Sequence, residues 1–155
     1  MNDLKIFDLR DFELATQKNY IGKGSNGIVH HLQYKKTQEF FAVKFLDSNI
    51  PNFEKLFLRE INILSKLEYP TLVQQYGIIS EPPAFVSEFV PNQTIQYYIN
   101  EAFQGKSHQG WDINNKINII LGISFGMKHL HSKGIIHRDL KPDNVLLDTN
   151  FYPKI

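Results

Sequence analysis

The stretch GIIHRDLKPDNVLL, residues 134 to 147, constrains this chain more than any other part of its sequence. It places two aspartates, an arginine, a lysine and an asparagine between the apolar segments IIH and NVLL, which we expect to form short buried strands. Pro142 and Asp143 also favour a plain solvated turn. Because buried flanks would bring the polar groups close to the protein interior, we interpret the loop as a functional site rather than as such a turn.

The residue types in this loop suit phosphoryl transfer. The Asp139 carboxylate can orient a hydroxyl nucleophile or accept its proton, and the Lys141 ammonium can offset charge on the moving phosphate. Asn144 adds an amide oxygen, which is a ligand that Mg²⁺ accepts. The loop therefore predicts a site for a hydroxyl, a phosphate and a metal ion.

Composition is that of an ordinary globular protein. The 155 residues are 42% hydrophobic and 21% charged with a net charge of +1, which argues against disorder and gives no bias toward nucleic acid or anionic membrane. Cysteine is absent, which excludes disulfides and thiolate metal sites. The N-terminus has no signal-peptide core, and the most apolar segment, INIILGISFGMKHL, is too short and too polar to span a bilayer. We expect a cytoplasmic protein that binds neither nucleic acid nor membrane.

Hydrophobic periodicity divides the chain into a sheet-rich part and a helical part. Residues 20 to 46 predict three antiparallel strands, a helix follows over about 52–67, and LVQQYGI and AFVSEFV predict two more strands. A boundary near VPNQ is followed by a short helix, QTIQYYINEA, and by a long helix from about 113 to 132. Asp112 is its expected N-cap and Gly134 its left-handed C-cap. Its apolar stripe is expected at Ile117, Ile120, Leu121, Ser124, Met127, Leu130 and His131.

GKGSNG, residues 22 to 27, has the spacing G-x-G-x-x-G. In a dinucleotide-binding fold such a segment leads from a strand into a helix, whereas the residues that follow here, IVHHLQY, favour a strand. The Walker pattern is also lacking. Two interpretations remain: a tight hairpin with no ligand, or a hairpin whose backbone amides close over phosphate oxygens, with Val29 as an apolar contact.

Lys44 and Glu60 are expected to pair. In the apolar strand FFAVKFL, Ala42 and Lys44 point to the same face, and a lysine in a buried strand needs an anion. Glu60 falls on the apolar stripe of the following helix, with Phe53, Phe57, Leu64 and Leu67. The pair could be a structural salt bridge without chemistry, or Glu60 could lie at the edge of the stripe. In the functional interpretation, Lys44 binds phosphate and Glu60 orients it.

Together, these segments resemble a eukaryotic protein kinase. GKGSNGIV resembles the glycine-rich loop, FAVK the strand-three lysine motif and HRDLKPDN the catalytic loop, in matching order and spacing over about residues 15–155. The resemblance implies an α+β fold with a five-stranded antiparallel N-lobe sheet and helix C over 15–90. An incomplete, mainly helical C-lobe over 91–155 follows, and residues 1–14 are an N-terminal extension.

The resemblance also implies catalytic roles. Asp139 matches the catalytic aspartate, Lys141 the phosphate-contacting lysine and Asn144 the Mg²⁺-binding asparagine, while Lys44 and Glu60 match the strand-lysine and helix-C pair. HRDLKxxN is typical of serine/threonine kinases, and YPTLVQQYGI and NQTIQYYI resemble the tyrosine-kinase-like group within them. The implied activity is transfer of the γ-phosphate of ATP, with Mg²⁺, to Ser and Thr hydroxyls of a protein substrate.

The implied nucleotide site comprises the glycine loop, the strands beside it and the hinge. Ser87 sits at the gatekeeper position, and Glu88 and Val90 would present backbone groups to the adenine edge. The other implied ATP-binding residues are Ile21, Gly22, Gly24, Gly27, Val29, Ala42, Lys44 and Leu146.

In the family, a segment like YPKI is followed by Asp-Phe-Gly, whose aspartate is the principal Mg²⁺ ligand. The 155 residues lack it, so we expect them to bind nucleotide poorly, to transfer phosphate negligibly and to leave part of the long helix exposed as a partner site. Two other interpretations stay open. One is a non-catalytic nucleotide-binding or partner-docking half-kinase, and the other is a small-molecule kinase or another ATP user.

Overall fold

The structure is a computed structural model that describes residues 4–15, 20–24 and 27–155. The chain separates into two compact units, the first made of residues 1–67 and 74–89 and the second of residues 68–73 and 90–155. Over the described ranges, none of the helices combines the length and the apolar character needed to cross a membrane.

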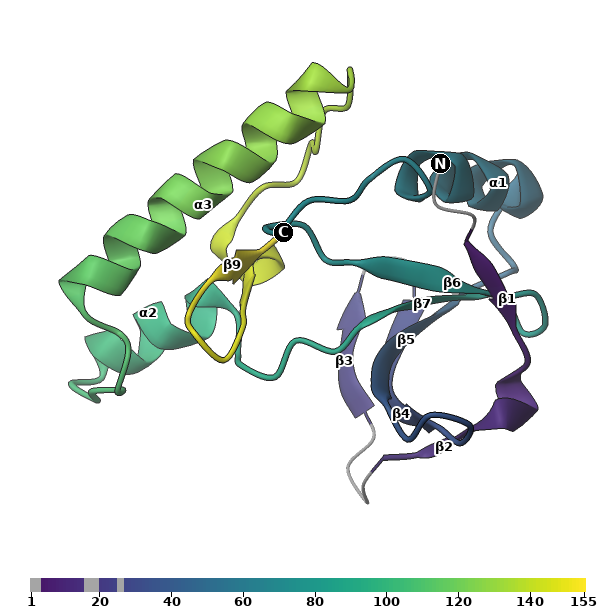
Figure 1. The fold of residues 1–155 in the computed structure, drawn as a ribbon, viewed down its shortest axis with the longest axis horizontal. Coiled ribbons are helices and arrows are strands. Elements are labelled where there is room, and N and C mark those ends of the chain that lie inside the picture. The colour runs from purple at the N-terminus through teal and green to yellow at the C-terminus, as the bar shows by residue number, and fades with distance from the viewer. Residues whose placement is uncertain (1–3, 16–19, 25–26) are drawn as a thin grey trace. The chain divides into compact units, whose positions relative to one another are not determined.

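The first unit is built on a curled sheet (Figure 1). Its described strands are β1 Lys5–Phe7, β2 Phe12–Leu14, β3 Tyr20–Gly24, β4 Gly27–Tyr34, β5 Phe40–Leu46, β6 Gln75–Ile79 and β7 Ala84–Glu88. The order is β1-β6-β7-β5-β4-β2, with β3 also paired to β4. The five predicted antiparallel strands are confirmed as β3 to β7. The segment expected to be an extension adds β2, which is antiparallel to β4, and β1, which is parallel to β6.

Aromatic residues from this N-terminal segment fill the core of the sheet. Phe7 and Phe12 are buried, and their ring centroids lie 5.6 Å apart. Both rings also contact Tyr34, at 5.3 and 5.2 Å. The same core contains Leu32, Phe41, Val43, Ile79, Ala84 and Val86. Residues 5–14 therefore form part of the folded sheet, joined by a short 3₁₀ turn at Leu9–Asp11.

Helix α1, Phe53–Leu64, lies within the predicted range of 52–67. Phe53 and Phe57 stack with ring centroids 5.6 Å apart, and Phe57 lies 5.2 Å from Phe85 of β7. The predicted stripe thus faces the sheet, although no residue of the helix is fully buried.

The second unit contains α2 Ile95–Phe103, α3 Ile113–Ser132, a 3₁₀ turn at Pro142–Asn144, and the paired strands β8 Leu146–Leu147 and β9 Pro153–Lys154. The capping predictions for α3 are confirmed. The Asp112 carboxylate accepts a hydrogen bond from the Asn115 N–H at 2.9 Å, which satisfies a free amide of the first turn. Gly134 has a φ of 70°, the left-handed conformation in which glycine carries no Cβ penalty.

The buried face of α3 coincides only in part with the predicted stripe. Ile117, Ile120 and Leu121 are 50%, 64% and 49% exposed, whereas Ile119, Gly122, Gly126 and Leu130 are buried. A Cβ at Gly122 would lie 2.5 Å from the ring of Pro153, so the missing side chain allows β9 to approach the helix. Leu130 belongs to the predicted stripe and is buried, and the exposure of Ile117, Ile120 and Leu121 agrees with the expectation that part of this helix is left uncovered. The closest contacts of the buried face are made by glycines, which a count of apolar residues does not identify.

The flanks of the charged loop also differ from expectation. IIH forms no strand: the Ile135 N–H donates to the Leu130 carbonyl at 3.0 Å and completes the end of α3, and Ile136 is 68% exposed. On the other flank, Val145 and Leu147 are buried as predicted. Only one side of the loop is therefore anchored in apolar packing.

Candidate functional site

Strands β4, β5 and β7 place four of the predicted nucleotide-binding residues on one face of the sheet. Val29 pairs with Lys44, and Ala42 pairs with Ser87. Directly paired side chains share a face, and residues two apart on a strand do as well, so all four point the same way. Val43, between Ala42 and Lys44, is fully buried on the other side. The Ser87 hydroxyl donates to the Ala42 carbonyl at 3.2 Å, which fixes its orientation.

The glycine-rich segment runs from strand to strand, as predicted. Gly24 pairs with Gly27, and Ile21, on β3, is 46% exposed. A Cβ at Gly27 would collide with the Phe45 carbonyl oxygen, so glycine is needed there for strand packing, whereas Gly22 faces open space. The backbone amides of this hairpin were predicted to close over phosphate oxygens, and two of its residues, Ser25 and Asn26, lie outside the described residues.

The predicted ion pair between Lys44 and Glu60 is not formed. Both side chains belong to the first unit and are half-buried, and neither makes an ion pair or a hydrogen bond in the described part of the chain. The prediction assumed full burial, which makes an unpaired charge costly. Partial exposure keeps both charges hydrated and removes that requirement.

The end of β7 is attached to the residue that precedes β6. The Glu88 N–H donates to the Gln74 carbonyl at 2.9 Å, and the Gln74 N–H donates to the Glu88 carboxylate at 2.7 Å. Val90, which belongs to the second unit, is only 8% exposed. The predicted hinge therefore begins from a strand end at which Glu88 is held by one hydrogen bond of its backbone and one of its side chain.

His31 lies on the same face of the sheet as Val29 and Ala42, and it was not predicted from the sequence. It pairs with Ala42, and its imidazole stacks on the Phe89 ring at 3.7 Å with an interplanar angle of 16°. Burial lowers the pKa of His31, which favours the neutral imidazole. Its position two residues after Val29 in a strand was the available signal.

In the second unit, the charged loop brings Asp139, Lys141 and Asn144 together. The Lys141 ammonium lies 3.1 Å from the Asp139 carboxylate. The Asn144 amide donates to the Asp139 carboxylate at 2.7 Å and to its backbone carbonyl at 2.8 Å. The Asp139 N–H donates to Nδ1 of His137 at 3.3 Å, a contact that the sequence analysis did not anticipate. Arg138 adopts a φ of 68°, which turns the chain between His137 and Asp139.

These contacts determine the charge of the loop. Hydrogen bonds from Lys141 and from Asn144 lower the pKa of Asp139 below its ordinary value of 3.8. The Asp139 side chain is 64% exposed, so the ionised carboxylate is open to a reactant in solution. A fixed, exposed carboxylate with an adjacent ammonium can orient a hydroxyl group beside an anion.

Buried residues after the loop keep it in place. The Ile95 N–H donates to the Val145 carbonyl at 2.9 Å, and the Leu147 N–H donates to the Gln93 carbonyl at 3.3 Å. Leu146, between the two buried residues, is half-buried and pairs with Lys154 on β9. The start of α2 and the strand pair β8–β9 thus carry the loop.

The donor atoms of the loop fit a magnesium ion in type but not in number. Because Asn144 donates its NH₂ group to Asp139, its amide oxygen is left as an acceptor, and Mg²⁺ prefers such hard oxygen ligands. Among the described residues, no group of three or more His, Asp or Glu side chains gathers to form a metal site. These residues could hold the ion only together with ligands from elsewhere, such as substrate phosphates.

Comparison with known proteins identifies the family. The family model described as the protein kinase domain matches residues 15–155 of this chain. The G-type lectin S-receptor-like serine/threonine-protein kinase SD1-1 of Arabidopsis thaliana is 35% identical over 99% of this chain, and the receptor-like kinase LIP1 of the same plant is 34% identical over 98%. The cysteine-rich receptor-like protein kinase 45 is 33% identical over 96%.

The chain spans only part of each of these relatives, namely 19%, 25% and 43% of their lengths. The match nevertheless extends over the glycine-rich hairpin, the strand that carries Lys44 and the loop that carries Asp139. The chain belongs to the protein kinase family and is related to plant receptor-like serine/threonine kinases.

Proposed function

We propose that this chain provides the nucleotide-binding strands and the catalytic loop of a serine/threonine protein kinase, which transfers the γ-phosphate of ATP to Ser and Thr hydroxyls of proteins. The observation that carries the proposal is the Asp139 carboxylate, ionised, exposed and fixed by Lys141 and Asn144 within one loop. The hydroxyl of a Ser or Thr side chain is a weak nucleophile. It needs a group such as this carboxylate to orient it and to accept its proton.

In this proposal each residue has a separate task. Asp139 orients the substrate hydroxyl and accepts its proton, and Lys141 offsets charge on the transferred phosphate. The sheet face with Val29 and Ala42 contacts the adenine, and Lys44 binds ATP phosphates. Mg²⁺, when bound, neutralises charge on the phosphate oxygens, and Asn144 supplies one of its ligands.

The 155 residues do not include the Asp-Phe-Gly segment of the family. Loss of one preorganised charge-stabilising group typically lowers a rate by about 10² to 10³. We therefore propose that this polypeptide, assayed alone, phosphorylates a generic basic protein at least that much more slowly than a complete kinase domain. If residues 1–155 alone transferred phosphate as fast as a complete kinase domain, the proposal that transfer depends on the Asp-Phe-Gly segment would be wrong.

The assigned roles can be tested in a longer polypeptide in which residues 1–155 continue into the rest of a kinase domain. Asp139→Asn should reduce phosphate transfer by about 10³ or more and leave ATP affinity within twofold, because the carboxylate acts on the hydroxyl. Asp143→Asn, in the same exposed loop, is the matched control. Phosphate incorporation and ATP binding are measured side by side, and full activity of Asp139→Asn would contradict the proposed function.

Lys44→Met tests the nucleotide role. It should weaken ATP binding by about tenfold, since a charge-assisted contact to a phosphate is lost. Lys55→Met, on the exposed side of α1, is the control for removing a lysine from the same unit. Unchanged ATP affinity and turnover in Lys44→Met would argue against the role assigned to it.

A further inference from the structure

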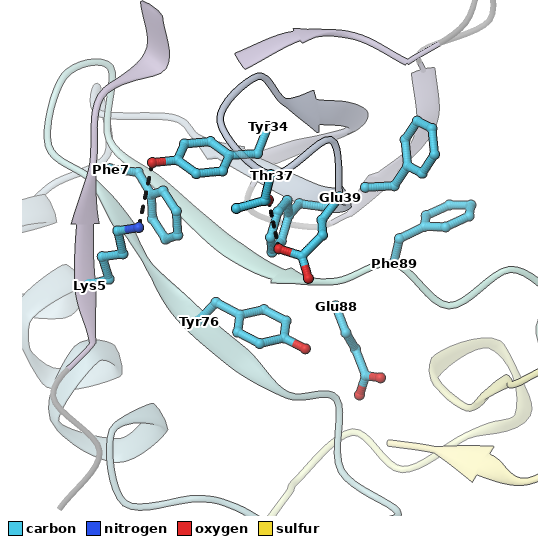
Figure 2. A pocket seen from close by; sticks show the side chains of 10 residues that line it. Lys5, Phe7, Tyr34, Thr37, Glu39, Tyr76, Glu88 and Phe89 are labelled. Carbon is cyan, nitrogen blue, oxygen red and sulfur yellow. Dashed lines mark hydrogen bonds between the residues drawn. The ribbon is translucent and has the colours of Figure 1, made fainter. Parts of the chain in front are cut away.

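A cavity of about 420 Å³ lies at one end of the curled sheet, within the first unit. Its walls come from β1, from the β4–β5 connection and from the ends of β6 and β7. Figure 2 shows the residues around it, and those used below are Lys5, Phe7, Tyr34, Glu39, Tyr76 and Glu88. Its volume is in the range of small-ligand sites. None of the roles proposed above for phosphate transfer uses this space.

The walls of this cavity are aromatic, and two of the rings already contact the cationic side chain of Lys5. The Lys5 ammonium lies 4.7 Å from the Phe7 centroid and 5.0 Å from the Tyr34 centroid, and it is 3.5 Å from the Tyr34 hydroxyl. Such distances give a favourable cation–π attraction. The cavity therefore stabilises a positive charge at one of its ends.

The opposite end is acidic. In Figure 2, the carboxylates of Glu39 and Glu88 lie on the side of the Tyr76 hydroxyl, with Lys5 on the other side beside Tyr34. Burial raises the pKa of Tyr76, and the negative charges of Glu88 and Glu39 raise it further. The two carboxylates thus give this end of the cavity a negative charge that faces the Tyr76 phenol.

Both carboxylates are oriented by neighbours. Glu39 accepts a hydrogen bond from the Thr37 hydroxyl at 2.7 Å, and Glu88 accepts from the Gln74 N–H at 2.7 Å. The Tyr76 ring is also fixed, because it packs edge-on against Phe41 with the centroids 5.3 Å apart. An incoming group therefore meets acceptors that are already positioned.

We propose that this cavity binds a guanidinium or alkylammonium group on an apolar stem, with the charge between Glu39, Glu88 and the Tyr76 hydroxyl and the stem against the aromatic walls. An anion is disfavoured because two carboxylates face the site. The ligand is either a free amine or guanidine or an arginine or lysine side chain of a peptide. This binding activity is additional to the proposed phosphate transfer and does not depend on it.

Two matched pairs of probes test the proposal on the 155-residue chain. Butylguanidine is compared with neutral butylurea, and N-acetyl-arginine methylamide with its citrulline counterpart, by NMR titration of the backbone amides. We expect the two guanidines to bind with dissociation constants on the order of 1 mM, typical of small fragments, and to shift amides near Glu39, Tyr76 and Glu88. Tighter binding of the arginine probe indicates a peptide ligand, and tighter binding of butylguanidine a free cation.

Charge variants then locate the bound group. Glu39→Gln and Glu88→Gln keep the hydrogen bonds to Thr37 and Gln74 and should each weaken guanidine binding about five- to tenfold. Lys5→Met removes a like charge and should strengthen it about two- to fourfold. Glu54→Gln, on the exposed side of α1, should change nothing.

Circular dichroism of each variant establishes that it is folded before its affinity is compared. Equal binding of the urea and guanidine probes would overturn the proposal. So would shifts confined to other parts of the chain, or unchanged affinity in both Glu39→Gln and Glu88→Gln. None of these measurements involves ATP or phosphate transfer. A negative result for guanidine binding therefore leaves the proposed kinase function standing, and a negative result for kinase activity leaves the proposed guanidine binding standing.

Discussion

The charge of Asp139 is balanced by partners that lie within five residues of it. Lys141 and Asn144 are positioned by the same short turn, so their contacts with the carboxylate need no other element. Lys44 and Glu60 stand on different elements, and their charges meet only if the helix is placed at one particular distance from the strand. Local charge clusters are therefore set by the chain itself, whereas distant pairs depend on packing.

The local cluster makes a prediction for titration. Lys141→Met should raise the pKa of Asp139 toward its ordinary value of 3.8, because the hydrogen bond from Lys141, which lowers this pKa most, is lost. Since the native pKa is depressed, the stabilisation by the ionised carboxylate is complete above about pH 4 and disappears as pH falls through the native value. Carbon-detected NMR of the Asp139 carboxyl measures this change.

Lys128→Met, on the exposed surface of α3, provides the control for the titration. It should leave the Asp139 curve in place. An unshifted Asp139 pKa in Lys141→Met would mean that the ammonium does not contact the carboxylate in solution.

At the scale of the element, the ends of α3 are determined by nearby capping residues, whereas its buried face is determined by packing against other parts of the second unit. Its ends follow from Asp112 and Gly134, whose effects are confined to the adjacent turn. Its buried face follows from Gly122 and Gly126, which sit against Pro153 and Thr71. Beside the buried side chains of Ile119 and Leu130, these two glycines thus allow the close approach of Pro153 and Thr71 to the helix.

Gly122→Ala tests this packing. Alanine in an exposed helix position would stabilise by up to about 1 kcal/mol, but here its Cβ would meet the rigid ring of Pro153. We expect a net loss of about 1 to 2 kcal/mol in the free energy of unfolding, measured by urea denaturation. Ser124→Ala, on the exposed side of the same helix, should be neutral or slightly stabilising. A stabilised Gly122→Ala would show that β9 does not pack there.

At the scale of the whole molecule, the folded sheet is larger than the family match. The protein kinase domain matches from residue 15 onward, yet Phe7 and Phe12 lie in the core of the first unit. The curl of the sheet brings β1 and β2, at the two ends of the strand order, close enough for their rings to touch. The segment before residue 15 therefore contributes to the stability of the strands that carry the predicted nucleotide-binding residues.

Phe12→Ala measures that contribution. Removal of a buried phenylalanine typically costs about 3 to 5 kcal/mol, so the first unit should unfold at a much lower urea concentration or fail to fold. Leu14→Ala, two residues further along the same strand and 68% exposed, should cost about 0.5 kcal/mol or less. Hydrogen exchange of the β4 and β5 amides reports the result. Equal stability of the two variants would place residues 5–14 outside the core.

Much of the fold was predictable because its signals are local. Alternating apolar residues defined β3 to β7, capping residues defined α3, and the types and spacing in HRDLKPDN defined the cluster around Asp139. The roles of β1 and β2 were not predictable, because segments of three residues contain too little periodicity to distinguish a strand from a tail.

The sequence by itself determined the family, the order of the strands and helices along the chain and the chemistry of the charged loop, since each depends on residues close together along the chain. Only the tertiary structure decided that Lys44 and Glu60 form no ion pair, that two glycines make the closest contacts of the buried face of α3, and that an acidic, aromatic cavity opens beside β1. These features depend on distances between elements, and small differences in burial and packing set those distances.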